Sequence, residues 1–365
     1  MVDLKIPLVV ENQVLDNEPS MLSGMSISHI VHLELSRITL SSKDVEVLPG
    51  TITDLSSNYE DQDTLCFDRL PLKKWTCMTR GSSVEFMGIF PHLTMLNFYQ
   101  HFGQKDIVTV PVSVTAFTGR ITGSLLFPAG LRLVTLELQC FEGSSPLFLD
   151  PAVALRSLRI SGEPLSTDVM RSILRVCNPL TLTVLSITVK NTKATLAALT
   201  GLAEFLHITT VSISQSMYHR VSSYMGSNVT VHQRRLVSQH ITLPDSITRL
   251  TLHAGDLDFE NLVLPRSLRS LSCWGMTCDI TQLIAITTLK NLRCVTPTHI
   301  TTLAQLSPVL EQLTATLETL SIEGLYLTTP REVINTYLEG YVRERRRYLQ
   351  TARILPLAVS SEDTS

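Results

Sequence analysis

Two neighbouring stretches of the chain share one pattern: Leu243-Pro-Asp-Ser-Ile-Thr-Arg-Leu-Thr-Leu252 and Leu264-Pro-Arg-Ser-Leu-Arg-Ser-Leu-Ser-Cys273. Each begins with Leu-Pro and ends in the spacing apolar-x-x-apolar-x-apolar. The alternating end is typical of a short strand with one buried face, because successive side chains of a strand point to opposite faces. Proline fixes φ and lacks an N–H, so it suits the turn that enters a strand. The pattern therefore predicts a copied unit of turn and strand.

The same spacing recurs along most of the chain. Its clearest copies are Ile30-Leu33-Leu35, Leu72-Trp75-Cys77, Leu93-Leu96-Phe98, Leu155-Leu158-Ile160, Leu182-Leu185-Ile187, Ile208-Val211-Ile213, Ile247-Leu250-Leu252, Leu268-Leu271-Cys273, Leu289-Leu292-Cys294 and Leu317-Leu320-Ile322. Weaker copies start at Ile52, at Val114 and at either Leu131 or Leu133, where both frames fit. Successive starts advance by about 20 to 22 residues from Ile30 to Val114. This period is typical of leucine-rich repeats, whose stacked copies bury one another's apolar faces.

A proline stands three residues before the first apolar position in five copies, at Pro49, Pro111, Pro128, Pro244 and Pro265. The resulting phrase Leu-Pro-x-Ser-Leu-x-x-Leu-x-Leu resembles FNIP-type repeats, relatives of the leucine-rich repeats. The resemblance extends over roughly residues 26–325. It implies an α/β, leucine-rich-repeat-like solenoid with a parallel sheet on the concave face and mixed turns and helices on the convex face.

The chain also departs from both families. Standard leucine-rich repeats place an asparagine after the strand, but the equivalent positions here hold His101, Gly255, Met276 and Pro297. The FNIP tetrapeptide is absent, and Phe259-Glu-Asn-Leu262 is only an approximate counterpart.

Longer units and the chain ends suggest the domain boundaries. Capping residues and helical apolar spacing predict helices over 166–177, 195–206 and 301–313. The organisation we expect is an N-terminal cap over 1–25, the solenoid over 26–328, a C-terminal capping helix over 329–352 and a flexible tail over 353–365. Residues 214–241 are either a degenerate copy or an inserted loop, and the spacing favours the degenerate copy.

Composition narrows the class of protein. The chain is 44% hydrophobic, 17% charged and has a net charge of −3, which argues against disorder and against a nucleic-acid partner. No apolar run is long enough for a membrane span, and no signal peptide precedes the repeats. Seven cysteines, an odd number scattered through apolar segments, are typical of reduced, buried thiols in an intracellular protein. We expect a cytoplasmic protein without membrane association, and the sequence predicts no oligomeric state.

Motifs for catalysis are missing from the sequence. It contains no G-x-G-x-x-G, no phosphate-binding loop, no G-x-S-x-G and no H-E-x-x-H. The spacing of Cys273, Cys278 and Cys294 matches no usual zinc pattern. The sequence therefore predicts a protein that is not an enzyme, with no catalytic residues, no metal site and no cofactor.

The residues between the apolar positions line the exposed face of the predicted sheet. Most are Ser or Thr, and among the charged ones bases outnumber acids: Lys73, Lys74, Arg156, Arg159, Arg249, Arg269, Lys290 and Arg293 against Glu34, Asp54 and Glu318. Arg249, Arg269, Lys290 and Arg293 fall on three successive predicted strands, roughly 4.8 Å apart. With Arg156 and Arg159, they are the candidate protein-binding residues.

Two interpretations of these charges remain. The functional hypothesis is that the strip recognises an acidic segment of a protein partner, because guanidinium groups suit carboxylates and phosphates. The other interpretation is that these residues are ordinary solubilising charges on an exposed sheet face. The sequence alone favours this second interpretation. The function we predict is a non-enzymatic protein-binding scaffold or adaptor. The alternative is a substrate-recognition subunit of a ubiquitin ligase or similar regulatory complex.

Overall fold

The computed structural model describes residues 8–11, 30–40, 42–59, 69–79, 90–100, 107–120, 124–139, 153–215, 241–253, 262–278, 283, 285–297, 303–313, 317–326, 336–337, 339–340 and 351–357. The chain divides into two compact units. Unit 1 comprises Met1–Glu163 and Ser172–Leu182, and unit 2 comprises Pro164–Arg171 and Thr183–Ser365. The boundary lies inside the predicted array of 26–328.

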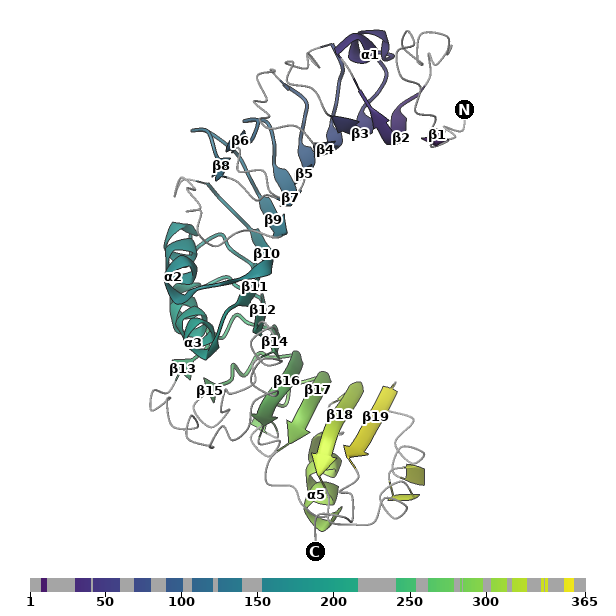
Figure 1. Cartoon of the computed structure of the whole chain (residues 1–365). Helices are drawn as coiled ribbons and strands as arrows, with labels where there is room; N and C mark the ends of the chain where they lie inside the picture. Colours follow the sequence, from purple (N-terminus) through teal and green to yellow (C-terminus); the bar gives the residue numbers. More distant parts are fainter. Residues whose placement is uncertain are drawn as a thin grey trace, which may run out of the picture. The chain divides into compact units, whose positions relative to one another are not determined.

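Unit 1 is built on parallel strands that lie side by side in chain order (Figure 1). They are β1 (Leu8–Glu11), β2 (His32–Thr39), β3 (Asp54–Tyr59), β4 (Lys74–Thr79), β5 (Met95–Gln100), β7 (Ala116–Arg120), β9 (Thr135–Gln139) and β10 (Ser157–Leu165). Helix α1 (Ser42–Val47) connects β2 to β3. Strands β6 (Ile107–Thr109) and β8 (Ser124–Leu126) form a separate short parallel pair.

Unit 2 repeats this arrangement with strands that are again parallel and in chain order. They are β11 (Val184–Val189), β12 (Thr210–Gln215), β14 (Arg249–His253), β16 (Ser270–Cys278), β17 (Asn291–Pro297), β18 (Thr319–Tyr326) and β19 (Thr351–Leu357). Strands β13 (Ile241–Thr242) and β15 (Leu262–Val263) form a separate short parallel pair just before the Pro244 and Pro265 turns. Both units are thus α/β with parallel strands, as expected.

The three helices predicted from the sequence are confirmed. They are α2 (Thr167–Val176), α3 (Thr192–Gly201) with the 3-10 turn η1 (Leu202–Glu204), and α5 (Leu303–Leu313). Helix α3 packs against β11 and β12. It begins earlier than predicted because the side chain of Asn191 accepts a hydrogen bond from the Ala194 N–H and caps the helix there.

The register of the strands reproduces the sequence pattern. Leu250 pairs with Leu271 and Leu252 with Cys273, so equivalent apolar residues of successive copies become neighbours. These side chains are buried, whereas Thr251 between them is not. We call the face that bears Thr251 and its equivalents the open face. In unit 1 the pairing of Phe117 with Leu136 selects the Leu133 frame rather than the Leu131 frame.

The predicted proline turns are confirmed by their hydrogen bonds. The carbonyl of each proline accepts the N–H three residues later: Ile52 to Pro49 at 3.2 Å, Val114 to Pro111 at 3.1 Å, Leu131 to Pro128 at 3.4 Å, Ile247 to Pro244 at 3.1 Å and Leu268 to Pro265 at 3.2 Å. Proline supplies the acceptor of this turn, and the donor it lacks is not needed there.

At most described strand entrances, one carbonyl group joins successive copies. The carbonyl of Thr248 accepts two N–H groups of the next copy, from Arg269 at 2.8 Å and from Ser270 at 3.0 Å. The Arg269 carbonyl in turn accepts from Lys290 and Asn291 at 2.8 and 3.0 Å. The same sharing recurs in unit 1, where the carbonyl of Thr94 accepts the N–H groups of Thr115 and Ala116. We call the residues that provide these carbonyls the junction row.

Hydroxyl groups reinforce the junctions and explain much of the Ser and Thr content. The Thr248 hydroxyl donates to the Thr209 carbonyl at 3.3 Å, and the Thr209 hydroxyl donates to the Thr183 carbonyl at 3.2 Å. One position before the first apolar residue, the Ser267 hydroxyl donates to the Ile247 carbonyl at 2.9 Å. These hydroxyls add side-chain hydrogen bonds between copies at the entrances of the strands.

Two expectations about the chain ends need correction. Residues 353–357, assigned to a flexible tail, belong to strand β19, which pairs with β18 through Leu320–Ala352 and Ile322–Ile354. The phrase Leu349-Gln-Thr-Ala-Arg-Ile354 fits the repeat spacing once alanine is admitted as an apolar residue. The predicted helix over 329–352 is helical at residues 336–337 and 339–340, but its last two residues lie in β19. Within the predicted cap over 1–25, β1 pairs with β2.

The structure gives one constraint on the choice between a degenerate copy and an inserted loop for residues 214–241. Strand β12 pairs directly with β14, through Val211–Leu250 and Ile213–Leu252, so no copy between them adds a strand to this sheet. Residues 216–240, which include the suspected copy, lie outside the described residues.

The buried alternation predicts the effect of truncation on strand β14. Leu252 is 0% exposed, so replacing it with alanine should lower the free energy of unfolding by about 2–5 kcal/mol. Thr251→Ala, on the open face of the same strand, should change it by less than about 0.5 kcal/mol. Urea unfolding followed by circular dichroism measures both variants. Equal shifts of the two midpoints would contradict the assigned faces.

Candidate binding surface

Two rows of side chains cross the open face of unit 2. The first row is Val184, Thr210, Arg249, Ser270, Asn291 and Thr319 on strands β11 to β18. The second row, one alternation further along, is Ser186, Ser212, Thr251, Ser272, Arg293 and Ser321. Among these described positions, from β11 to β18, Arg249 and Arg293 alone are charged, and the second row continues to Arg353 on β19, in register with Ser321. The surface is otherwise almost entirely neutral and hydroxyl-bearing.

The two arginines lie on either side of strand β16. Arg249 on β14 is in register with Ser270, and Arg293 on β17 is in register with Ser272. Their backbones are separated by two strand spacings, about 10 Å, and by one alternation, about 7 Å along the strands. Both side chains are exposed. The serines between them are small, so no long side chain of β16 stands between the arginines at these two positions.

His253 lies on the same face, at the last residue of β14. It is partly buried, and its backbone is in register with Trp274. Burial lowers the pKa of His253 below its usual 6.5, and the positive charge of Arg293 lowers it further. Arg293 is on β17 and His253 on β14, the strands on either side of β16. We refer to Arg249, His253 and Arg293, which lie on the open face of these two strands, as the cluster.

Arg269 and Lys290 do not belong to the two rows. They lie one residue before Ser270 and Asn291, in the junction row, so the expected strip of four cations is divided between three register rows. The three strands are adjacent as predicted. The four cations are not aligned because they occupy different positions of the pattern apolar-x-x-apolar-x-apolar. The first x is the junction position, which holds Arg269 and Lys290. The second x, which holds Arg249, and the third x, which holds Arg293, lie on the open face.

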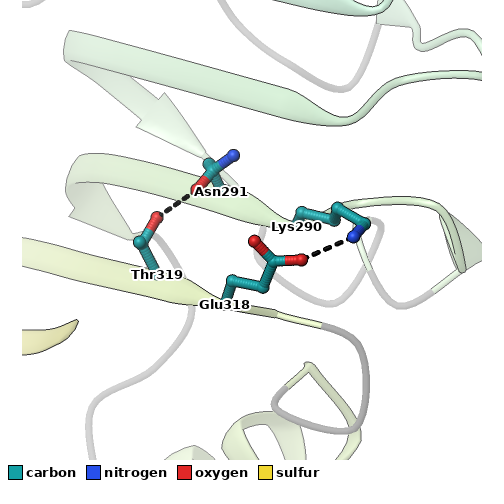
Figure 2. A network of polar contacts seen from close by, with 4 residues as sticks. All are labelled: Lys290, Asn291, Glu318 and Thr319. Atoms are coloured by element: carbon teal, nitrogen blue, oxygen red, sulfur yellow. Dashed lines mark hydrogen bonds and ion pairs between the residues drawn. The ribbon is translucent and has the colours of Figure 1, made fainter. Parts of the chain in front are cut away.

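Lys290 also has an acidic neighbour (Figure 2). Its Nζ lies 2.5 Å from Oε1 of Glu318, in the next copy of the junction row. Nearby, the Thr319 hydroxyl donates to the Asn291 side-chain oxygen at 2.6 Å. The ion pair is 52% and 39% exposed, so it contributes about 0–1 kcal/mol to stability. Its main effect is to balance the charge of Lys290 locally.

Arg156 and Arg159, the remaining candidates, lie in unit 1. Arg156 is in its junction row, and Arg159 on β10 is in register with Glu137 on β9. The acid next to Arg159 was missed in the sequence because two frames fitted equally well at Leu131 and Leu133. The structure therefore gives Arg159 an acidic neighbour in its own row, unlike Arg249 and Arg293.

The described cysteines offer little chemistry. Cys77, Cys177 and Cys273 are buried and not in disulfides, as expected from the sequence. Burial raises the pKa of Cys177 to about 12 and that of Cys77 still higher, so neither thiol ionises near neutral pH. Within the described ranges, no group of three or more His, Cys, Asp or Glu side chains is placed to hold a metal ion. No helix in that part of the chain is long and apolar enough to cross a membrane.

Comparison with known proteins adds no relative: no family model, no curated protein and no solved structure matches the chain.

The influence of Arg293 on His253 gives a direct test of the cluster. In the folded protein the pKa of His253 should lie below 6.5, and Arg293→Gln should raise it because a repelling positive charge is removed. Lys290→Gln, which removes a cation that Glu318 already balances, should leave it almost unchanged. NMR titration of the histidine ring signals measures both. If Arg293→Gln left the pKa of His253 unchanged, the two side chains would not interact, and the cluster would be contradicted.

Proposed function

We propose that this protein is a non-enzymatic, leucine-rich-repeat-like binding scaffold, and that the open face of unit 2 binds an acidic segment of a partner protein. The observation that supports this most is the placement of Arg249 and Arg293. They are exposed on two rows that otherwise hold almost only uncharged polar side chains. No described acid shares these rows between β11 and β18.

The chemistry of the surface suits an acidic peptide. A guanidinium group presents donors in a planar fork that matches a carboxylate, and it stays charged at any physiological pH. Two such groups on β14 and β17, the strands on either side of β16, add a local positive field to a chain whose net charge is −3. The hydroxyls and amide around them provide both donors and acceptors, which an extended peptide backbone needs.

The contrast with the junction row favours recognition over solubility. Lys290 has Glu318 beside it, as expected of charges that only keep a surface hydrated. Arg249 and Arg293 instead lie in the two open-face rows, whose described positions from β11 to β18 include no acid. We therefore prefer the binding interpretation for these two residues and the solubilising one for Lys290.

The repeat class and location belong to the same proposal. Copies of about 21 residues from Ile247 to Leu289, proline turns and parallel strands support a leucine-rich-repeat-like class, in which strand faces are common binding surfaces. Cys77, Cys177 and Cys273 are buried and not in disulfides, which supports a reducing compartment such as the cytoplasm.

Binding of a glutamate-rich peptide tests the proposal. A fluorescent Gly-Ser peptide containing several glutamates should bind the full chain, and its glutamine counterpart should not. The double variant Arg249→Gln/Arg293→Gln should lower the affinity by about tenfold or more, since each lost charge-assisted contact removes a substantial part of the binding energy. Fluorescence anisotropy at low and at physiological salt measures these affinities.

The matched control removes the same charge from the junction row. Arg269→Gln/Lys290→Gln should change the affinity by no more than about twofold. Equal losses in the two double variants would mean that only net charge matters. That result, or a peptide that binds no better than its glutamine counterpart, would overturn the proposal.

A further inference from the structure

We draw no further inference here: the strongest candidate, the exposed apolar residues Pro91, Val112 and Ala129 at the turns that enter strands β5, β7 and β9 of unit 1, is an apolar surface for which nothing in the described part of the structure shows what covers it.

Discussion

The carbonyl shared at most described strand entrances is the interaction on which the rest of this structure depends. One junction-row carbonyl accepts two consecutive N–H groups of the next copy, as Thr248 does from Arg269 and Ser270. This arrangement fixes the register of each strand on its predecessor. A slip of one residue would turn every buried leucine toward the open face, and the junction prevents it. Burial of the alternating apolar residues and the proline turns stabilise the same register.

A fixed register converts sequence repetition into rows of neighbouring side chains. Residues that occupy the same place in successive copies come to lie beside one another, although they are far apart in the chain. The open face therefore shows how each position varies from copy to copy. Between β11 and β18 that variation is small, because most positions are Ser or Thr, and the two charged positions, Arg249 and Arg293, belong to the candidate binding cluster.

Much of the fold follows from local pattern. The copies, their proline turns, three helices and the burial of the apolar positions could be predicted, because each depends on residues close together in the sequence. Strand β19 was missed because its copy uses Ala352 where other copies use larger apolar residues, and helix α1 is too short to give a helical period. The direct pairing of β12 with β14 could not be predicted, because the length of the connection between them does not reveal which strands become neighbours.

The sequence by itself determined the repeating unit, the kind of residue at each of its positions and the three strands that hold the candidate cations. Only the tertiary structure decided which of those cations share a surface. It placed Arg249 and Arg293 on adjoining open-face rows, moved Arg269 and Lys290 to the junction row, and set Glu318 beside Lys290. The physical reason is that these relations arise from hydrogen bonds between copies, which align residues across strands, whereas a sequence pattern describes only one copy at a time.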